Sequence, residues 1–231
     1  MGNQMFQFAG GYAIAKRLGY DFGLLQGNQI KCFDVSEFVT DYRPEREVEM
    51  MSMGYCGDVF VEDDTYIKCY FQSEKYFLEV EDDIRRMFTF RELEPVRPSG
   101  NVCSVHVRRG DYLTRGAKAL YCMADGYFHC AMKIMRERMN GVRFLVFSDD
   151  MPWCVENLGA DDVSYSTGYT CQHDLLNMAS CDAHIIANST YSWWASWLSG
   201  RLTIAPDKWL KKTDSRDIYC SDWMVIGAEV V

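Results

Sequence analysis

Short runs of β-branched and aromatic residues alternate with helical repeats in the second half of the chain. Four of these runs have the length and composition of buried strands: residues 102–107, 144–147, 184–187 and 202–205. Between the first two, apolar residues recur at the spacing of one helix face: Phe128, Ala131, Met132, Met135 and Met139. Strands that alternate with helices predict an α/β fold with a parallel sheet covered on both sides.

The first half follows a less regular pattern. A moderate apolar stripe predicts a helix over residues 4–18, and short strand-like runs follow at 22–25 and 67–71, before a helix ending near residue 90. Residues 27–66 mix acids, glycines and aromatics with little periodicity. The Pro- and Gly-containing segment 94–100 has the composition of a linker. We therefore predict two lobes, residues 1–97 and 98–231.

The first predicted helix begins almost at the first residue. In a covered parallel sheet such a helix follows a strand, whose apolar side chains fill the centre of the sheet. Only three residues precede it here. We therefore expect the true or ancestral protein to start upstream with a β-rich segment that ends in glycines. We expect this 231-residue form, with its small, truncated first lobe, to be less stable and weakly active or inactive.

Polar residues follow each strand predicted in the second half. These clusters are residues 108–111, 148–150, 188–190 and 206–207. In parallel sheets, ligands bind in the crevice beyond the carboxyl ends of the strands. The pattern therefore predicts a binding site built from these four clusters.

Arg108 and Arg109 come directly after the first of these strands and precede Gly110 and Asp111. Guanidinium groups hold phosphate oxygens bidentately, and a glycine lets the backbone approach a ligand, so this tetrad predicts a phosphate site. The alternative is a surface ion pair between either arginine and Asp111.

Two of the other three clusters offer different chemistry. Asp149 and Asp150 either bind sugar or base hydroxyl and amino groups, or cap a helix. Small polar side chains follow the third strand, just before a predicted helix whose free N–H groups suit a phosphate: Asn188, Ser189, Thr190 and Ser192. In the alternative reading, Ser192 only caps that helix.

Charge and cysteine spacing narrow the function classes. The net charge of −9 makes nucleic acid an unsuitable partner. Residues 1–97 carry 11 basic and 18 acidic residues, and the remainder carries 13 and 15, so a small anionic ligand fits the second half better. The ten cysteines include no C-x-x-C pair, which predicts reduced thiols and no zinc site.

No apolar run approaches the length of a membrane span, and the first residues lack the features of a secretory signal. We therefore expect a cytoplasmic protein. Peripheral association with the inner face of the membrane stays open.

Five stretches together resemble the inverting α-1,2-fucosyltransferases of glycosyltransferase family 11. They are GNQMFQFA at 2–9, YFQSEKYF at 70–77, VHVRRGDY at 105–112, FSDD at 147–150 and IANSTYSWW at 186–194. The resemblance implies a GT-B-type fold of two Rossmann-like lobes, here without the family's first strand. It implies transfer of L-fucose from GDP-β-L-fucose to the 2-hydroxyl of a galactose-terminated glycan, with no cofactor and no metal.

The resemblance also implies roles for residues. Arg108 and Arg109 would stabilise the charge of the departing diphosphate, as fixed donors do in other active sites. Asp149 and Asp150 would hold the nucleoside. Asn188, Ser189, Thr190 and Ser192 would hold the phosphates in lobe 98–231. The acceptor would lie against lobe 1–97, near Asn3, Gln4 and Glu74.

Direct displacement with inversion needs a base near the acceptor hydroxyl, and Asp111, Glu74 and His106 are three open candidates. Two rival functions remain. One is a metal-dependent glycosyltransferase with Asp149 and Asp150 as cation ligands, although such enzymes usually space these acids by one residue. The other is a catalytically weak or inactive relic that binds a sugar nucleotide or glycan.

Overall fold

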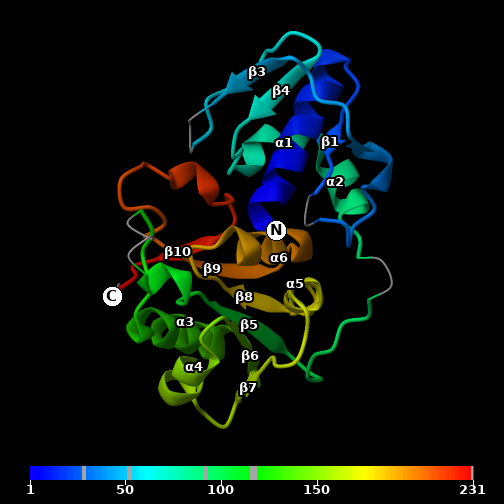
Figure 1. Cartoon of the computed structure of the whole chain (residues 1–231). Helices are drawn as coiled ribbons and strands as arrows, with labels where there is room; N and C mark the ends of the chain where they lie inside the picture. Colours follow the sequence, from blue (N-terminus) through cyan, green and yellow to red (C-terminus); the bar gives the residue numbers. More distant parts are fainter. Residues whose placement is uncertain (28–29, 51–53, 91–92, 115–118, 230) are drawn as a thin grey trace. The chain divides into compact units, whose positions relative to one another are not determined.

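The chain forms two compact units. The computed structural model describes residues 1–27, 30–50, 54–90, 93–114, 119–229 and 231 (Figure 1). The first unit comprises residues 1–92 and 214–220, and the second comprises 93–213 and 221–231. The chain thus passes from the first unit to the second near residue 92, and a late segment returns to the first. The sequence predicted a single boundary, after residue 97, so the return of residues 214–220 to the first unit was not predicted.

A six-stranded parallel sheet with helices between its strands forms the second unit, which confirms the predicted α/β class. In chain order the elements are β5 (Val102–Val107), α3 (Asp125–Arg138), β6 (Arg143–Ser148), α4 (Met151–Leu158), β7 (Val163–Tyr165), α5 (Cys171–Ala179), β8 (Ala183–Ile185), α6 (Thr190–Ser199), β9 (Leu202–Pro206) and β10 (Met224–Ile226). All four predicted strands are present. Two more, β7 and β10, are three residues long and were not predicted.

The strand order fixes where a ligand can bind. The strands lie in the order β10-β9-β8-β5-β6-β7, and every pairing is parallel. The chain therefore starts at β5, moves outward through β6 and β7, and returns to the other side of β5 at β8. This is the Rossmann order, and its topological switch point lies between β5 and β8.

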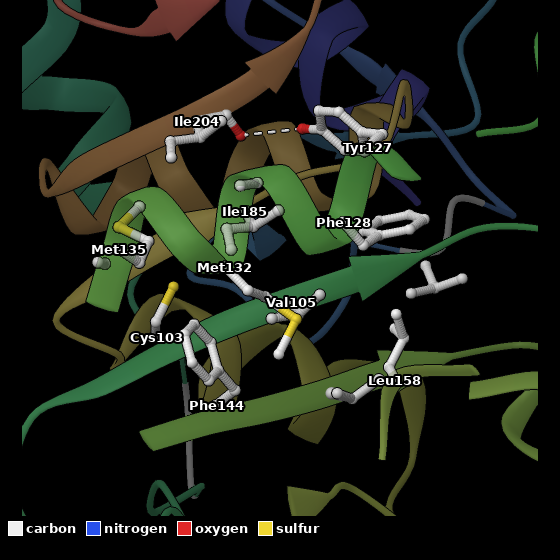
Figure 2. Close-up of a cluster of buried hydrophobic side chains, with 14 of the residues drawn as sticks. Cys103, Val105, Tyr127, Phe128, Met132, Met135, Phe144, Leu158, Ile185 and Ile204 are labelled. Carbon is white, nitrogen blue, oxygen red and sulfur yellow. Dashed lines mark hydrogen bonds between the residues drawn. The ribbon is translucent and has the colours of Figure 1, made fainter. Parts of the chain in front are cut away.

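One face of the sheet carries the main apolar core of the second unit. Because side chains alternate along a strand, Cys103, Val105 and Val107 of β5 all point to this face, where α3 and α4 cover them. Figure 2 shows Phe128 and Met132 of α3 among these side chains. The helical repeat predicted from the sequence is thus the buried face of α3.

The opposite face of the sheet is unusually polar. Ser104, His106 and His184 point away from the apolar core, and each is at most 5% exposed. On this side His106 contacts Ser192 of α6, and α5 lies beside α6 (Figure 1). Buried histidines and serines here must satisfy one another, since burying an unpaired polar group is costly.

The first unit begins with α1 (Gly2–Leu18), which starts two residues before the predicted helix and ends at Gly19, where a φ of 74° suits glycine. The remaining strands and the second helix are β1 (Leu24–Leu25), β2 (Val39–Thr40), β3 (Arg46–Glu49), β4 (Thr65–Lys68) and α2 (Glu81–Met87). Phe8 of α1 packs against Phe22, Phe38 and Phe88. β1 pairs with β2 and β3 with β4, in two separate parallel sheets. A Rossmann-like sheet is therefore described for the second unit only.

Two further features bear on the sequence predictions. All ten cysteines are free thiols, in agreement with their spacing. Within the described part of the chain, no helix has the combined length and apolar character that crossing a membrane requires.

Candidate active site

The polar clusters predicted from the sequence gather at the carboxyl edge of the sheet. β5 pairs with β6 on one side and with β8 on the other, so residues 108–111 lie between residues 148–150 and 188–190. The register places Val107 opposite Ser148, the last residues of β5 and β6. The acids after β6 therefore lie beside the arginines after β5.

Arg109 is buried and links the loop after β5 to the loop after β6. Its backbone N–H donates to Asp149 Oδ1 at 2.9 Å, and its Nε donates to Asp150 Oδ2 at 3.2 Å. The guanidinium lies 4.0 Å from the ring centroid of Trp153, and the side chain is only 10% exposed. A cation held over an aromatic face and paired with a carboxylate is well fixed in position.

Arg108 is more open and bridges two carboxylates. Its Nη2 lies 2.9 Å from Asp111 Oδ1, and its Nη1 lies 3.1 Å from Asp149 Oδ2. The side chain is 36% exposed, against 10% for Arg109. The ion pair with Asp111 that the sequence left as an alternative is therefore present, and about a third of the Arg108 side chain is still exposed.

Asp149 and Asp150 organise the loop after β6. Asp150 caps α4, because its Oδ1 accepts from the backbone N–H of Trp153 at 3.3 Å. Asp149 receives the Arg109 N–H and the Arg108 guanidinium. Among the described residues, no cluster of three or more His, Cys, Asp or Glu side chains is arranged around a common metal position.

Gly110 is required by the close approach of Asp149. A Cβ built on Gly110 would lie 2.8 Å from Asp149 Oδ2 and 3.2 Å from its Cγ. A Cβ only 2.8 Å from a carboxylate oxygen is closer than real Cβ atoms come, so an alanine here would have to displace the Asp149 side chain or the loop. The sequence suggested that this glycine lets the backbone approach a ligand. In the structure, the atoms that approach it closely belong to the side chain of Asp149.

The start of α6 contributes the third cluster. Ser189 caps the helix by accepting from the Tyr191 N–H at 3.4 Å, and Thr190 is the first helical residue. Asn188 is 2% exposed and its amide donates to the carbonyls of Tyr121 and Trp209 at 3.0 and 2.9 Å. Both amide protons are thereby used, and its Oδ1 is a buried acceptor with no partner in the described structure.

His106 and Ser192 form a contact inside the unit at the same end of the sheet. Ser192 is fully buried and its Oγ lies 2.8 Å from His106 Nδ1. Burial lowers the pKa of His106 to about 4, helped by Arg108 and opposed by Asp149. The imidazole is therefore neutral near pH 7.

Of the predicted site residues, Asn3, Gln4 and Glu74 belong to the first unit, and Glu74 begins a short 3₁₀ helix, Glu74–Tyr76. Two contributors were missed. Trp153 covers Arg109, and Tyr112 donates through its hydroxyl to the Asn188 carbonyl at 3.0 Å. Burial raises the pKa of Tyr112 to about 12. Tyr112 follows the arginine cluster directly, so its position was a usable signal, whereas nothing in the sequence pairs Trp153 with Arg109.

Comparison with known proteins decides the family. The model of glycosyl transferase family 11 matches residues 31–227, which include four of the five stretches quoted above. The chain belongs to glycosyl transferase family 11. The resemblance seen in the sequence is thereby confirmed.

Several known proteins are similar to this chain. An α-1,2-colitosyltransferase of Escherichia coli is 35% identical over 162 residues, which is 63% of this chain and 56% of the relative. The O-antigen biosynthesis glycosyltransferase WbnK of Escherichia coli is 27% identical over 183 residues, covering 74% and 60%. Galactoside α-(1,2)-fucosyltransferase 1 of Gorilla gorilla gorilla is 26% identical over 272 aligned residues, covering 99% and 73%. The alignments with the two bacterial relatives thus span little more than half of those proteins.

Proposed function

We propose that this family 11 protein is a galactoside α-1,2-fucosyltransferase, which transfers L-fucose from GDP-β-L-fucose to the 2-hydroxyl of a galactosyl acceptor with inversion. Family membership supports a glycosyl transfer, and relatives named for α-1,2 transfer support the linkage. The observation that carries the proposal is the partly exposed side chain of Arg108, which directly follows β5, one of the two strands at the switch point.

In this proposal, Arg108 binds the diphosphate. A fixed cation near the leaving group stabilises the negative charge that develops as the glycosidic bond breaks, and one such donor is typically worth about a hundredfold to a thousandfold in rate. Asp111 and Asp149 hold the guanidinium before the nucleotide arrives. The phosphate would then compete with these carboxylates for the same N–H groups.

The other arginine has a different part in the proposal. Arg109 is covered by Trp153 and engaged with Asp150. It positions the loops after β5 and β6, and so sets the place of Arg108. In this proposal, Asp149 and Asp150 bind the nucleoside of GDP-fucose. Their carboxylate oxygens would accept hydrogen bonds from its hydroxyl or amino groups.

The beginning of α6 would receive the phosphates through its backbone N–H groups, with Ser189 and Thr190 at the first turn. We assign Asn188 a structural part in the site, because its amide N–H groups already donate to the carbonyls of Tyr121 and Trp209. We further propose the GT-B arrangement for the whole protein, with lobe 98–231 binding the nucleotide and lobe 1–97, including Glu74, facing the acceptor.

Three residues remain candidates for the base: Asp111, Glu74 and His106. Asp111 is 61% exposed and paired with Arg108, whereas His106 is buried and neutral. Comparing kcat in Asp111→Asn, Glu74→Gln and His106→Gln separates the three, since removal of the base lowers kcat far more than KM.

GDP release from GDP-fucose, measured across a panel of galactosides with and without excess EDTA, tests the proposal. We expect release that depends on a terminal galactoside and is unchanged by EDTA. Activity restored only by Mn²⁺ or Mg²⁺ would favour the metal-dependent alternative, and GDP-fucose binding without turnover would favour the inactive relic. Because one relative is named for colitose, nucleotide-activated colitose belongs in the donor panel.

A further inference from the structure

Two Ser–His pairs lie on the polar face of the sheet. Ser192 Oγ is 2.8 Å from His106 Nδ1, and Ser104 Oγ is 2.7 Å from His184 Nδ1. Residues 104 and 106 are two apart on β5 and so share one face. Each imidazole thus has a serine hydroxyl as its partner at Nδ1. The two rings differ in their position along the strands, because His184 pairs in register with Ser104 and His106 lies two residues further along β5.

The surroundings of Ser192 indicate which nitrogen of His106 carries the proton. The Ser192 hydroxyl also donates to the Ser189 carbonyl at 3.3 Å, and a hydroxyl has a single proton to give. A carbonyl can only accept, so both contacts are satisfied together only when His106 Nδ1–H donates to Ser192 Oγ. In the opposite tautomer, fully buried Ser192 would lose its bond to Ser189.

The two histidines differ at their other nitrogen. His184 is 0% exposed, and its Nε2 is a buried atom with no partner in the described structure. His106 retains 5% exposure and lies two residues before Arg108, at the ligand end of β5. The tilted ring of Tyr191 lies against it, with centroids 5.6 Å apart. Because His184 pairs in register with Ser104, His106 lies two residues nearer the carboxyl end of the sheet and is the histidine closer to the proposed ligand site.

We propose that Ser192 is a positioning residue that holds His106 as the Nδ1–H tautomer, so that Nε2 offers a lone pair to a hydroxyl or N–H group of the bound nucleotide sugar. The contact between Nε2 and the nucleotide sugar rests on the proposed function, whereas the assignment of the tautomer does not. Ser192 thus acts through His106 and has no direct contact with phosphate. The lowered pKa of His106 agrees with an imidazole that accepts a hydrogen bond while staying neutral.

Nitrogen NMR of ¹⁵N-histidine-labelled protein at neutral pH reads the tautomer directly. The chain has only four histidines, so His→Gln variants assign every signal. We expect His106 in the free protein to show a protonated Nδ1 and an unprotonated Nε2. A protonated Nε2, or rapid exchange between both forms, would overturn the assignment.

Ser192→Ala tests the positioning, and Ser104→Ala is its matched control at the other pair. We expect Ser192→Ala to move the His106 signals toward the Nε2–H form or a mixture while leaving those of His184 in place. Ser104→Ala should do the reverse. Unchanged His106 signals in a folded Ser192→Ala protein would show that the serine does not set the tautomer.

Titration with GDP-fucose tests the contact between Nε2 and the nucleotide sugar. We expect the His106 Nε2 signal to shift on saturation, the His184 signals to stay, and Ser192→Ala to raise the Kd about two- to tenfold, as loss of one hydrogen bond does. Saturation seen at backbone amides without a shift at His106 would overturn the contact. Absence of any binding would instead contradict the proposed function and leave the tautomer result standing.

Discussion

The backbone N–H of Arg109 donates to Oδ1 of Asp149 across 2.9 Å, between residues that are 40 positions apart. The same carboxylate reaches the Arg108 guanidinium through Oδ2 at 3.1 Å. One aspartate therefore fixes both the backbone after β5 and the side chain that we propose for the diphosphate. The arginine cluster after β5 is thus held in place by an aspartate that follows the neighbouring strand, β6.

This bridge makes Gly110 sensitive to any side chain. In Gly110→Ala the new Cβ would lie 2.8 Å from Asp149 Oδ2, so the carboxylate or the loop must shift. We expect kcat/KM for GDP-fucose to fall at least tenfold, about 1.4 kcal/mol, because Arg108 loses its fixed position. The control is Gly227→Ala, whose Cβ would meet nothing within 4 Å. Equal activity in both variants would contradict the role of the bridge.

Arg108→Ala removes the group proposed to bind the diphosphate. Loss of such a charge-assisted contact costs about 2 to 5 kcal/mol, or roughly thirtyfold to several thousandfold in kcat/KM. The melting temperature should change little, because the side chain is 36% exposed. Arg136 of α3, whose side chain is 40% exposed, forms an ion pair with Asp162, and Arg136→Ala is the matched control. Steady-state kinetics with wild-type values for Arg108→Ala would exclude this phosphate contact.

Arg109→Ala should mainly affect stability. It removes the cation from the Trp153 face and leaves Asp150 without its partner, and a partly buried pair of this kind is worth about 2 kcal/mol. For a chain of this length, that corresponds to a fall in melting temperature of about 4–8 °C. Arg216→Ala, in which an 88% exposed arginine is removed, should melt like the wild type. A melting temperature for Arg109→Ala matching that control would show that the pair does not hold the loops.

The buried histidines predict how stability depends on pH. Burial lowers the pKa of His106 to about 4 and that of His184 to about 3, below the value of about 6.5 for an unfolded chain. Between pH 6.5 and 4 the unfolded state therefore binds more protons, so the free energy of unfolding falls as the pH is lowered.

Each histidine contributes a slope of up to about 1.4 kcal/mol per pH unit in this range. We expect His184→Gln to flatten the dependence measured by urea unfolding at several pH values. His129→Gln, at an exposed position, should leave the slope as in the wild type. An unchanged slope in His184→Gln would mean that His184 takes up its proton in the folded state.

The sequence predicted the second unit well because its signals are local. The runs that became β5, β6, β8 and β9 are apolar and end in polar clusters, and the buried face of α3 follows the helical repeat. By contrast, β7 and β10 have only three residues each and carry no recognisable pattern. In the first unit, β3 is mostly exposed and charged, and it is defined by pairing with β4, which local hydrophobicity does not reveal.

The candidate site divides in the same way. The residue types at the strand ends indicated an anion site, but the partners of Arg108 and Arg109 depend on β5 lying next to β6 in a register that pairs Val107 with Ser148. The burial of Ser192 against His106 likewise depends on how α6 lies on the sheet. Such contacts join residues 40 and 86 positions apart and could not be inferred from spacing.

The central claim is the transfer of L-fucose to O2 of a galactoside, and NMR linkage analysis of the reaction product tests it most directly. We expect a long-range correlation between fucose H1 and galactose C2, with the coupling of an α-fucoside, in the product formed from GDP-fucose by the wild type and lost with Arg108→Ala. A linkage at another galactose carbon, a β-fucoside, or free fucose as the only product would contradict the account.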